Sequence, residues 1–195
     1  MSAPRLLGAV LAGGASVRFG RDKAVEPIAG VRLVDRAADA FAEVCEDVVV
    51  VTSRPIETER ATIPDLRPGR GPLAGIEAAL AHASDRGFDA ALVLACDLPL
   101  IRSTSLAALV SALGSEEAVA AFRDGPPGYE PLCAVYRVTC LGAARALLDE
   151  GEGAAQRLLE DVAGATIALP EDELLNVNTT EDGARADAAF EARRG

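Results

Sequence analysis

The sequence predicts an α/β protein with one domain, built on a mostly parallel, doubly wound sheet with helices on both faces. Three observations support this prediction. Short apolar runs without polar alternation are typical of strands buried on both faces of a parallel sheet. These runs alternate with segments of helical hydrophobic spacing, as in repeated strand–helix units. The chain has 195 residues, half of them hydrophobic, which suits one domain with a substantial core.

The first part of the chain is predicted to form a strand, a helix and a second strand. Leu6–Leu11 is an apolar run that leads into glycines, which indicates a buried strand followed by a loop. Residues 31–44 have helical spacing, and Asp47–Thr52 is dense in valine, which favours another parallel strand. The apolar face of the predicted helix consists of Val34, Ala37, Ala38 and Phe41.

The central part follows a polar stretch and continues the alternation. Residues 72–84 are predicted to form a helix, with Pro72 in its first turn, where proline is favoured. Residues 88–95 are the strongest apolar run and predict a buried strand. Residues 104–113 are predicted to be helical, with Ser103 or Thr104 as the N-cap.

The last part contains two more strands and the remaining helices. Ala118–Phe122 and residues 133–136 are predicted strands, separated by a loop over residues 123–131. After them we expect helices over 139–150 and 154–162, a short strand over 166–169 and an amphipathic helix over 180–194. The sequence shows neither internal repeats nor a linker, so residues 1–195 are predicted to form a single domain.

Composition argues against several classes of protein. A net charge of −11 leaves no basic face for nucleic acid. The longest apolar runs, 48–51 and 90–95, are too short to span a membrane. The opening segment MSAPRLLGAVLAGG is interpreted as the first strand and not as a signal peptide, so a cytoplasmic location is expected. Four cysteines without a C-x-x-C pair, and one histidine, favour reduced and mostly buried thiols over a structural zinc site.

The loop after the first predicted strand has the residues of a phosphate cradle. It reads LAGGASVRFGRDK from Leu11 to Lys23. Its two glycines let backbone amides approach a ligand closely, and Arg18 and Lys23 add positive charge. The glycine spacing fits neither the P-loop nor the dinucleotide fingerprint. The alternative is an ordinary tight turn with solvated basic residues.

Two further loops follow predicted strands and carry carboxylates. Asp97 comes directly after the strand over 88–95, at the rim where doubly wound sheets bind ligands, and Mg²⁺ favours a few carboxylates together with substrate phosphates. Asp65 precedes a glycine-rich turn that opens a helix, whose N-terminus favours anions, and Asp65 has acceptors for a base or ribose. The alternatives are a turn or cap residue before Pro99 and a solvated surface carboxylate, respectively.

Together the three loops supply an amide cradle, cations and a metal ligand, which are the parts that phosphoryl transfer requires. There is no competing Ser-His-Asp or Cys-His arrangement, because His82 falls within a predicted helix and is interpreted as a surface residue. Lys23 adds a second argument. It is the one lysine beside eighteen arginines, and it falls inside the proposed phosphate loop.

Five motifs resemble those of the molybdenum cofactor guanylyltransferase family, in family order and over nearly the whole chain. They are LAGG-x-S-x-R-F-G-x-D-K at 11–23, GPLAGIEAAL at 71–80, LACDLPLI at 94–101, EPLCAVY at 130–136 and NVNTTED at 176–182. The resemblance implies a Rossmann-like fold and Mg²⁺-dependent transfer of GMP from GTP to molybdopterin, with pyrophosphate leaving. It also implies a nucleotide-binding half over about 1–102, an acceptor-binding half over about 103–195, and transient contact with molybdoenzymes or a cofactor carrier.

The resemblance also implies roles for individual residues. Lys23 would contact the phosphates and, with Arg18, neutralise developing charge, whereas Asp65 would contact the nucleoside. Asp97 would bind GTP and Mg²⁺. The residues lining the nucleotide would be Leu11, Ala12 and Gly13. The LAGG form accompanies guanine in that family, whereas related cytidylyltransferases tend to carry LAAG.

The acceptor side is less fully determined by the resemblance. Asn176 and Asn178 would lie near the acceptor, although Asn178 or Thr179 could instead cap the last helix. The sequence departs from the family pattern after Lys23, where Ala-Val-Glu replaces a leucine pair, at Ser53, aligned with an asparagine, and at Thr180, aligned with a proline. Two alternatives stay open: transfer of GMP, CMP or another nucleotide to a different phosphorylated acceptor such as cobinamide phosphate, and a non-catalytic protein that delivers the cofactor.

Overall fold

The computed structural model describes residues 4–13, 23–126 and 128–193. Its central feature is a seven-stranded sheet with the order β5-β4-β1-β6-β8-β7-β9. β8 runs antiparallel to both of its neighbours, and all other pairs in this sheet are parallel. The mostly parallel sheet predicted from the sequence is therefore confirmed. The strands are β1 Leu6–Leu11, β4 Asp47–Thr52, β5 Ala61–Pro64, β6 Ala90–Ala95, β7 Ala118–Phe122, β8 Tyr129–Arg137 and β9 Ala165–Ala168.

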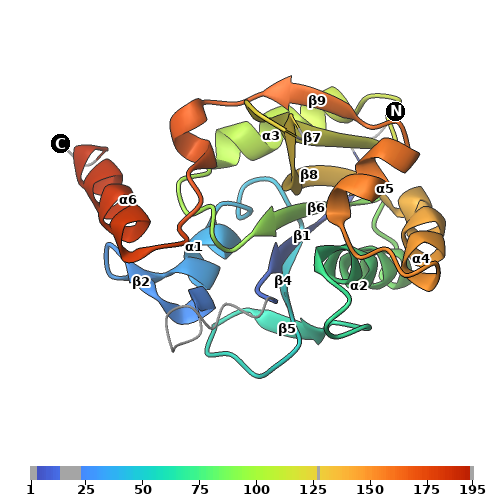
Figure 1. Ribbon diagram of the computed structural model, residues 1–195, viewed down its shortest axis with the longest axis horizontal. Coiled ribbons are helices and arrows are strands. Elements are labelled where there is room, and N and C mark those ends of the chain that lie inside the picture. The colour runs from blue at the N-terminus through green and yellow to red at the C-terminus, as the bar shows by residue number, and fades with distance from the viewer. Residues whose placement is uncertain (1–3, 14–22, 127, 194–195) are drawn as a thin grey trace.

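Helices cover both faces of this sheet (Figure 1). Successive side chains of β1 point to opposite faces, so Leu7 and Ala9 belong to the core cluster that includes α2, α4 and α5, whereas Leu6 and Val10 belong to the cluster that includes α1 and α3. Both sets of side chains are buried, which explains why β1 reads as a continuous apolar run. The helices are α1 Leu33–Asp39, α2 Pro72–Asp85, α3 Ser103–Leu113, α4 Leu141–Asp149, α5 Ala155–Asp161 and α6 Thr180–Ala192.

A small separate unit lies beside the sheet, at the left of Figure 1. The two-stranded hairpin of β2 Pro27–Ile28 and β3 Val31–Arg32 packs against α6. Its core consists of Ile28, Leu33, Val177 and Ala186. This unit brings the segment before α6 next to Lys23, which follows β1 in the chain.

Several predicted boundaries are wrong, for identifiable reasons. The helix expected over 31–44 is limited to Leu33–Asp39, because β3 takes up its beginning and turns replace its end. β5 lies in the stretch interpreted as merely polar; it is a short edge strand with mostly exposed residues, so it has no apolar signature. The loop expected over 123–131 ends earlier, because β8 begins at Tyr129. The N-cap of α3 is Arg102, so Ser103 is its first residue.

No described helix is long and apolar enough to cross a membrane. The four cysteines are free, as expected, with Cys133 and Cys140 buried and Cys45 and Cys96 half-buried. His82 is half-buried on α2.

Candidate active site

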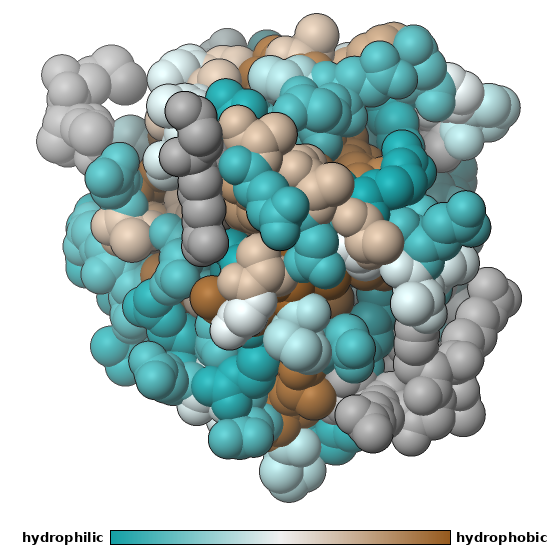
Figure 2. Space-filling model, turned by 90° about the vertical axis from the view of Figure 1, so that its left-hand side faces the viewer, coloured by the Kyte–Doolittle hydropathy of each residue, from teal (hydrophilic) through white to brown (hydrophobic). Residues whose placement is uncertain are grey.

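The candidate site is a cavity of about 610 Å³ at the edge of the sheet where β1, β4 and β6 end. β6 points to the left in Figure 1, so Figure 2, which views the molecule from that side, faces this edge. The predicted residues Leu11, Ala12, Gly13, Lys23, Asp65 and Asp97 all line the cavity. Ser53, Gly71, Pro72, Gly75, Leu132 and Asn178 are further lining residues. The structure thus brings together the three loops that the sequence singled out.

Leu11, the last residue of β1, lines the cavity together with Ala12 and Gly13. The Ala12 N–H donates to the carbonyl of Val51 at 3.0 Å, so the strand pairing continues to the rim. Arg18, predicted to act with Lys23, and the rest of the loop over 14–22 lie outside the described residues.

Lys23 joins three segments that are distant in the sequence. Its Nζ donates to Oδ2 of Asp97 at 2.9 Å and to Oδ1 of Asn178 at 2.7 Å. Only 11% of the lysine side chain is exposed, and the neighbouring Ala24 is buried in the core. The short 3-10 helix Lys23–Val25 therefore holds the ammonium group at a defined place on the cavity wall.

The segment before α6 is fastened to the turn that carries Asp97. The Val177 N–H donates to the backbone carbonyl of Asp97 at 2.8 Å, and the Val177 side chain is buried beneath. Thr179 is the N-cap of α6 and forms a capping box with Asp182. The alternative that Asn178 or Thr179 caps this helix is therefore confirmed for Thr179 and not for Asn178, whose amide oxygen accepts a hydrogen bond from Lys23.

Asp65 lines the cavity from the loop between β5 and α2. Its N–H donates to the carbonyl of Thr52 at 3.0 Å, and its Oδ1 accepts the Arg67 N–H at 2.8 Å. Within the described part of the chain, Oδ2 of Asp65 has no hydrogen-bond partner. The carboxylate is thus held by one oxygen, while the other can accept a hydrogen bond from a ligand.

Sequence reasoning assigned no role to Glu130, which lies close enough to Asp97 to feel its charge, or to its partner Arg123. Arg123 Nη1 donates to Oε2 of Glu130 at 3.0 Å and to Oδ1 of Asn176 at 3.1 Å. Burial raises the pKa of Glu130 above its ordinary value, and the charge of Asp97 adds to this rise while Arg123 opposes it. Glu130 belongs to the quoted EPLCAVY motif, but it reaches this edge only because β8 runs opposite to its neighbours. The apolar pattern of a sequence does not show in which direction a strand runs relative to its neighbours.

The described lining of the cavity carries no net positive charge to offset a polyphosphate ligand. Among the described lining residues, the cations Lys23 and Arg54 balance the carboxylates Asp65 and Asp97. No described group of three or more His, Cys, Asp or Glu side chains could hold a metal ion by itself. A divalent metal here would therefore be shared between the protein and the ligand's phosphates.

The position and size of the cavity, and the lysine and carboxylate at its wall, suit nucleotide chemistry. Comparison with known proteins gives the class: the protein is a nucleotidyltransferase. More narrowly, residues 8–167 match the family described as MobA-like NTP transferase domain, and the chain belongs to that family.

Individual relatives cover nearly the whole chain. A molybdenum cofactor guanylyltransferase from Desulfosudis oleivorans is 32% identical over 96% of this chain and 96% of its own length. One from Rhodobacter capsulatus is 33% identical, over 94% of this chain and 95% of its own. The solved structure of molybdopterin-guanine dinucleotide biosynthesis protein A from Archaeoglobus fulgidus superposes with a TM-score of 0.78, at 24% identity, covering 95% of this chain and 99% of that one. The relatives support a nucleotidyltransferase role in molybdenum cofactor biosynthesis, and the superposition confirms the fold.

Proposed function

We propose that the protein transfers GMP from GTP to the terminal phosphate of molybdopterin, releasing pyrophosphate. The observation that carries this proposal is the contact of Lys23 with Asp97 and Asn178, which places a cation, a carboxylate and an amide at one point of the nucleotide-sized cavity. The names of relatives that align over nearly the whole chain supply the nucleotide and the acceptor.

The reaction would proceed by direct displacement. An oxygen of the acceptor phosphate attacks the α-phosphorus of GTP and forms a new P–O bond. The bond from the α-phosphorus to the oxygen that bridges to the β-phosphorus breaks, and pyrophosphate leaves with that oxygen. Such a transfer depends on positioning and charge neutralisation, and needs no covalent nucleophile from the protein.

Asp97 fits the role of Mg²⁺ ligand. Its side chain is 22% exposed at the cavity wall, and one carboxylate with substrate phosphates is a typical Mg²⁺ arrangement. When bound, Mg²⁺ neutralises charge on the phosphates. Lys23 would exchange its contacts with Asp97 and Asn178 for phosphate oxygens, and Arg18 would add charge from the same loop. Asn176 and Asn178 would then orient the acceptor.

Asp65 would recognise the base. Guanine presents N1–H and N2–H donors, which suit the carboxylate oxygen of Asp65 that no described residue contacts. A site built for those donors rejects bases that lack them, because its acceptor would be left unpaired. Leu11, Ala12 and Gly13 would line the nucleotide.

The test is pyrophosphate release with carrier-loaded molybdopterin, Mg²⁺ and each nucleoside triphosphate in turn. We expect kcat/KM for GTP to exceed that for ATP or CTP by about 10²-fold or more, since binding that reads a base donor discriminates on this scale. Chelation of Mg²⁺ should abolish release. Equal kcat/KM for GTP and CTP would contradict the assignment of guanine.

Asp97→Asn tests the role of Asp97 as Mg²⁺ ligand, because it removes the charge of the side chain and keeps its shape. Turnover should fall by orders of magnitude while the fold persists, since the group lies at the rim and not in the core. GTP binding without pyrophosphate release by the wild-type protein, even with loaded acceptor, would favour the cofactor-delivery alternative. Near-normal turnover of the variant at limiting Mg²⁺ would mean that another carboxylate holds the metal.

A further inference from the structure

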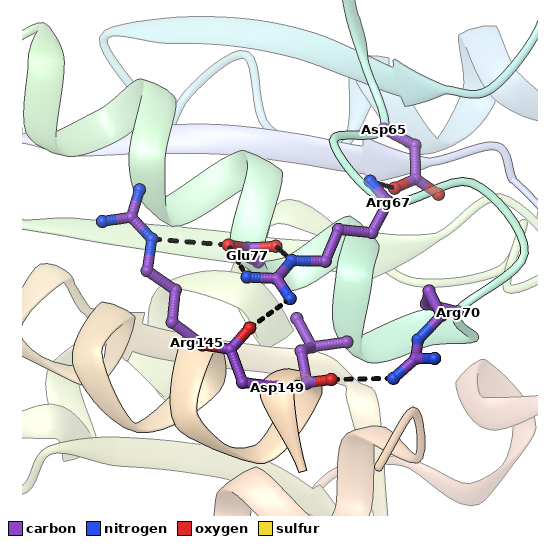
Figure 3. A network of polar contacts seen from close by, with 7 residues as sticks. Asp65, Arg67, Arg70, Glu77, Arg145 and Asp149 are labelled. Carbon is purple, nitrogen blue, oxygen red and sulfur yellow. Dashed lines mark hydrogen bonds and ion pairs between the residues drawn. The ribbon is translucent and has the colours of Figure 1, made fainter. Parts of the chain in front are cut away.

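A buried carboxylate lies behind the loop that carries Asp65 (Figure 3). Glu77 is on the second turn of α2. Although it carries a carboxylate, it is only 3% exposed and lies among the buried apolar residues of that helix. A buried carboxylate is costly unless it is paired and hydrogen-bonded. The residues that pair with Glu77 therefore indicate which part of the structure this buried carboxylate holds in place.

Two arginines satisfy Glu77, one from the loop and one from α4. Arg67 Nε donates to Oε2 at 2.9 Å and its Nη2 to Oε1 at 3.4 Å, while Arg145 Nε donates to Oε1 at 3.3 Å. Arg67 also pairs with Asp149 of α4. Figure 3 shows the Arg67 guanidinium between the carboxylates of Glu77 and Asp149.

Arg67 also determines the position of the Asp65 carboxylate. The backbone N–H of Arg67 donates to Oδ1 of Asp65, so the residue that Glu77 fixes through its side chain holds the Asp65 carboxylate through its main chain. A second anchor lies further along the loop, where Arg70 Nη2 donates to the carbonyl of Leu148 at 2.8 Å. The loop follows the edge strand β5 and belongs to no strand itself, so these side chains hold it in place.

We propose that Glu77 is a positioning residue for nucleobase selectivity, acting through Arg67 on the Asp65 carboxylate. This inference rests on the proposed function in one respect, namely that Asp65 contacts the base. Recognition of a base requires an acceptor held to within about half an ångström, and groups behind the contacting residue provide that precision. Glu77 is the fixed point of this arrangement because α2 packs on the sheet with most of its side chains buried.

A purely structural role for Glu77 makes a different prediction, which a second buried carboxylate can test. Glu173 is 1% exposed and is also held by an arginine, with Arg102 Nε 3.2 Å from its Oε1 and the Arg102 N–H donating to its Oε2 at 3.0 Å. It lies outside the lining of the nucleotide cavity. Glu173→Gln therefore repeats the loss of a buried, arginine-paired charge without touching the Asp65 loop.

The experiment is a calorimetric titration of Mg·GTP and Mg·ATP into the full-length wild-type protein and its variants, with melting temperature measured in parallel. Glu77→Gln should lower the ratio of GTP to ATP affinity by about 10-fold, from a wild-type ratio of about 10²-fold or more. Arg67→Lys should lower it as well, because it replaces the two-pronged contact with a single point charge and leaves Glu77 paired with Arg145. Glu173→Gln should lower the melting temperature and leave the ratio unchanged.

Arg145→Ala is the control within the network. It removes the arginine that contacts Glu77 without belonging to the loop, so the ratio should stay at the wild-type value. Equal wild-type affinities for the two nucleotides, or an unchanged ratio in both Glu77→Gln and Arg67→Lys, would overturn the inference. Failure of the wild-type protein to release pyrophosphate would count against the proposed function alone, because these titrations need no acceptor.

Discussion

Lys23 shows how one side chain can be matched to its position. Its ammonium group donates to two oxygens on different segments, at 2.9 and 2.7 Å, and is largely buried between them. A lysine ammonium is a compact point charge with donors that can turn to new partners, whereas an arginine guanidinium is a planar fork of fixed directions. This geometry gives a physical reason for a lysine in a chain that otherwise uses arginine.

Lys23→Arg should therefore lose most activity although it conserves charge. We expect kcat/KM for GTP to fall by about 10-fold or more, which corresponds to ~1.4 kcal/mol or more of transition-state stabilisation. Lys23→Ala should be worse. Steady-state pyrophosphate release measures both variants, and circular dichroism confirms that they fold. Wild-type kcat/KM in Lys23→Arg would mean that the loop's cation is Arg18 or Arg21.

At the scale of elements, the loop before α2 fits closely against the loop before α5. A Cβ at Gly153 would stand 2.1 Å from the carbonyl oxygen of Arg70, and one at Gly71 would stand 2.5 Å from the carbonyl oxygen of Gly153. Gly71 also has a φ of 81°, in the region that favours glycine. The Leu73 N–H donates to the Gly153 carbonyl at 3.1 Å. The opening turn of α2 is thus held against the second half of the chain by backbone contact.

Gly153→Ala should destabilise the protein by about 1–3 kcal/mol, because overpacking forces two backbones apart. Urea unfolding measures this, and GTP affinity should fall with it, since Gly71 lines the cavity. Gly142→Ala in α4 is the matched control: apart from its chain neighbours and the backbone of its own helix, no atom lies within 4 Å of the added Cβ, so it should be neutral or stabilise by up to about 1 kcal/mol. A Gly153→Ala midpoint equal to that of Gly142→Ala would show that the loops separate freely.

Comparison of predicted and observed elements shows what an apolar pattern records. The bounds of β1, β4 and β7 agree with the sequence prediction because most residues of each strand are both apolar and buried. Helical spacing continued through Phe41 because that side chain is fully buried, although α1 ends at Asp39 and turns follow. The apolar pattern of the sequence indicates which residues are buried, and the backbone hydrogen bonds that define helices and strands have to be inferred from it. Edge strand β5, with little buried surface, was therefore missed.

The candidate site was predictable to a similar extent. Asp97 and the loop that ends at Lys23 were predicted to line the site because they follow apolar strands, whose ends meet at one edge of such a sheet. Asp65 follows β5, which was missed, and was proposed instead from the glycine-rich turn that opens α2. Arg123 and Glu130 were missed because their place depends on the direction of β8. Glu77 could have been noticed, since it occupies the buried face of α2 together with Leu73, Ile76 and Leu80 at helical spacing.

At the scale of the whole molecule, the net charge of −11 opposes the approach of an anionic substrate. We expect the association rate constant of a fluorescent GTP analogue with Mg²⁺ to rise as salt increases from about 10 to 150 mM, because the screening length falls from about 30 to 8 Å. Stopped-flow fluorescence measures this rate. Uncharged guanosine, as a labelled nucleoside, is the control and should show no salt dependence. A rate that falls with salt would instead indicate a local positive field that dominates at the cavity.

The hydrogen bond between Lys23 and Asn178 spans 155 positions of the chain. Contacts between such distant residues form late in folding, because a long loop must close before they contribute. During synthesis, the strand β1 and the lysine leave the ribosome long before the asparagine exists. A nascent chain that already contains the cavity residues of β1 and Lys23 therefore still lacks Asn178. Competence to hold GTP in its final geometry should arise only once residue 178 has been added and the unit of β2, β3 and α6 has assembled.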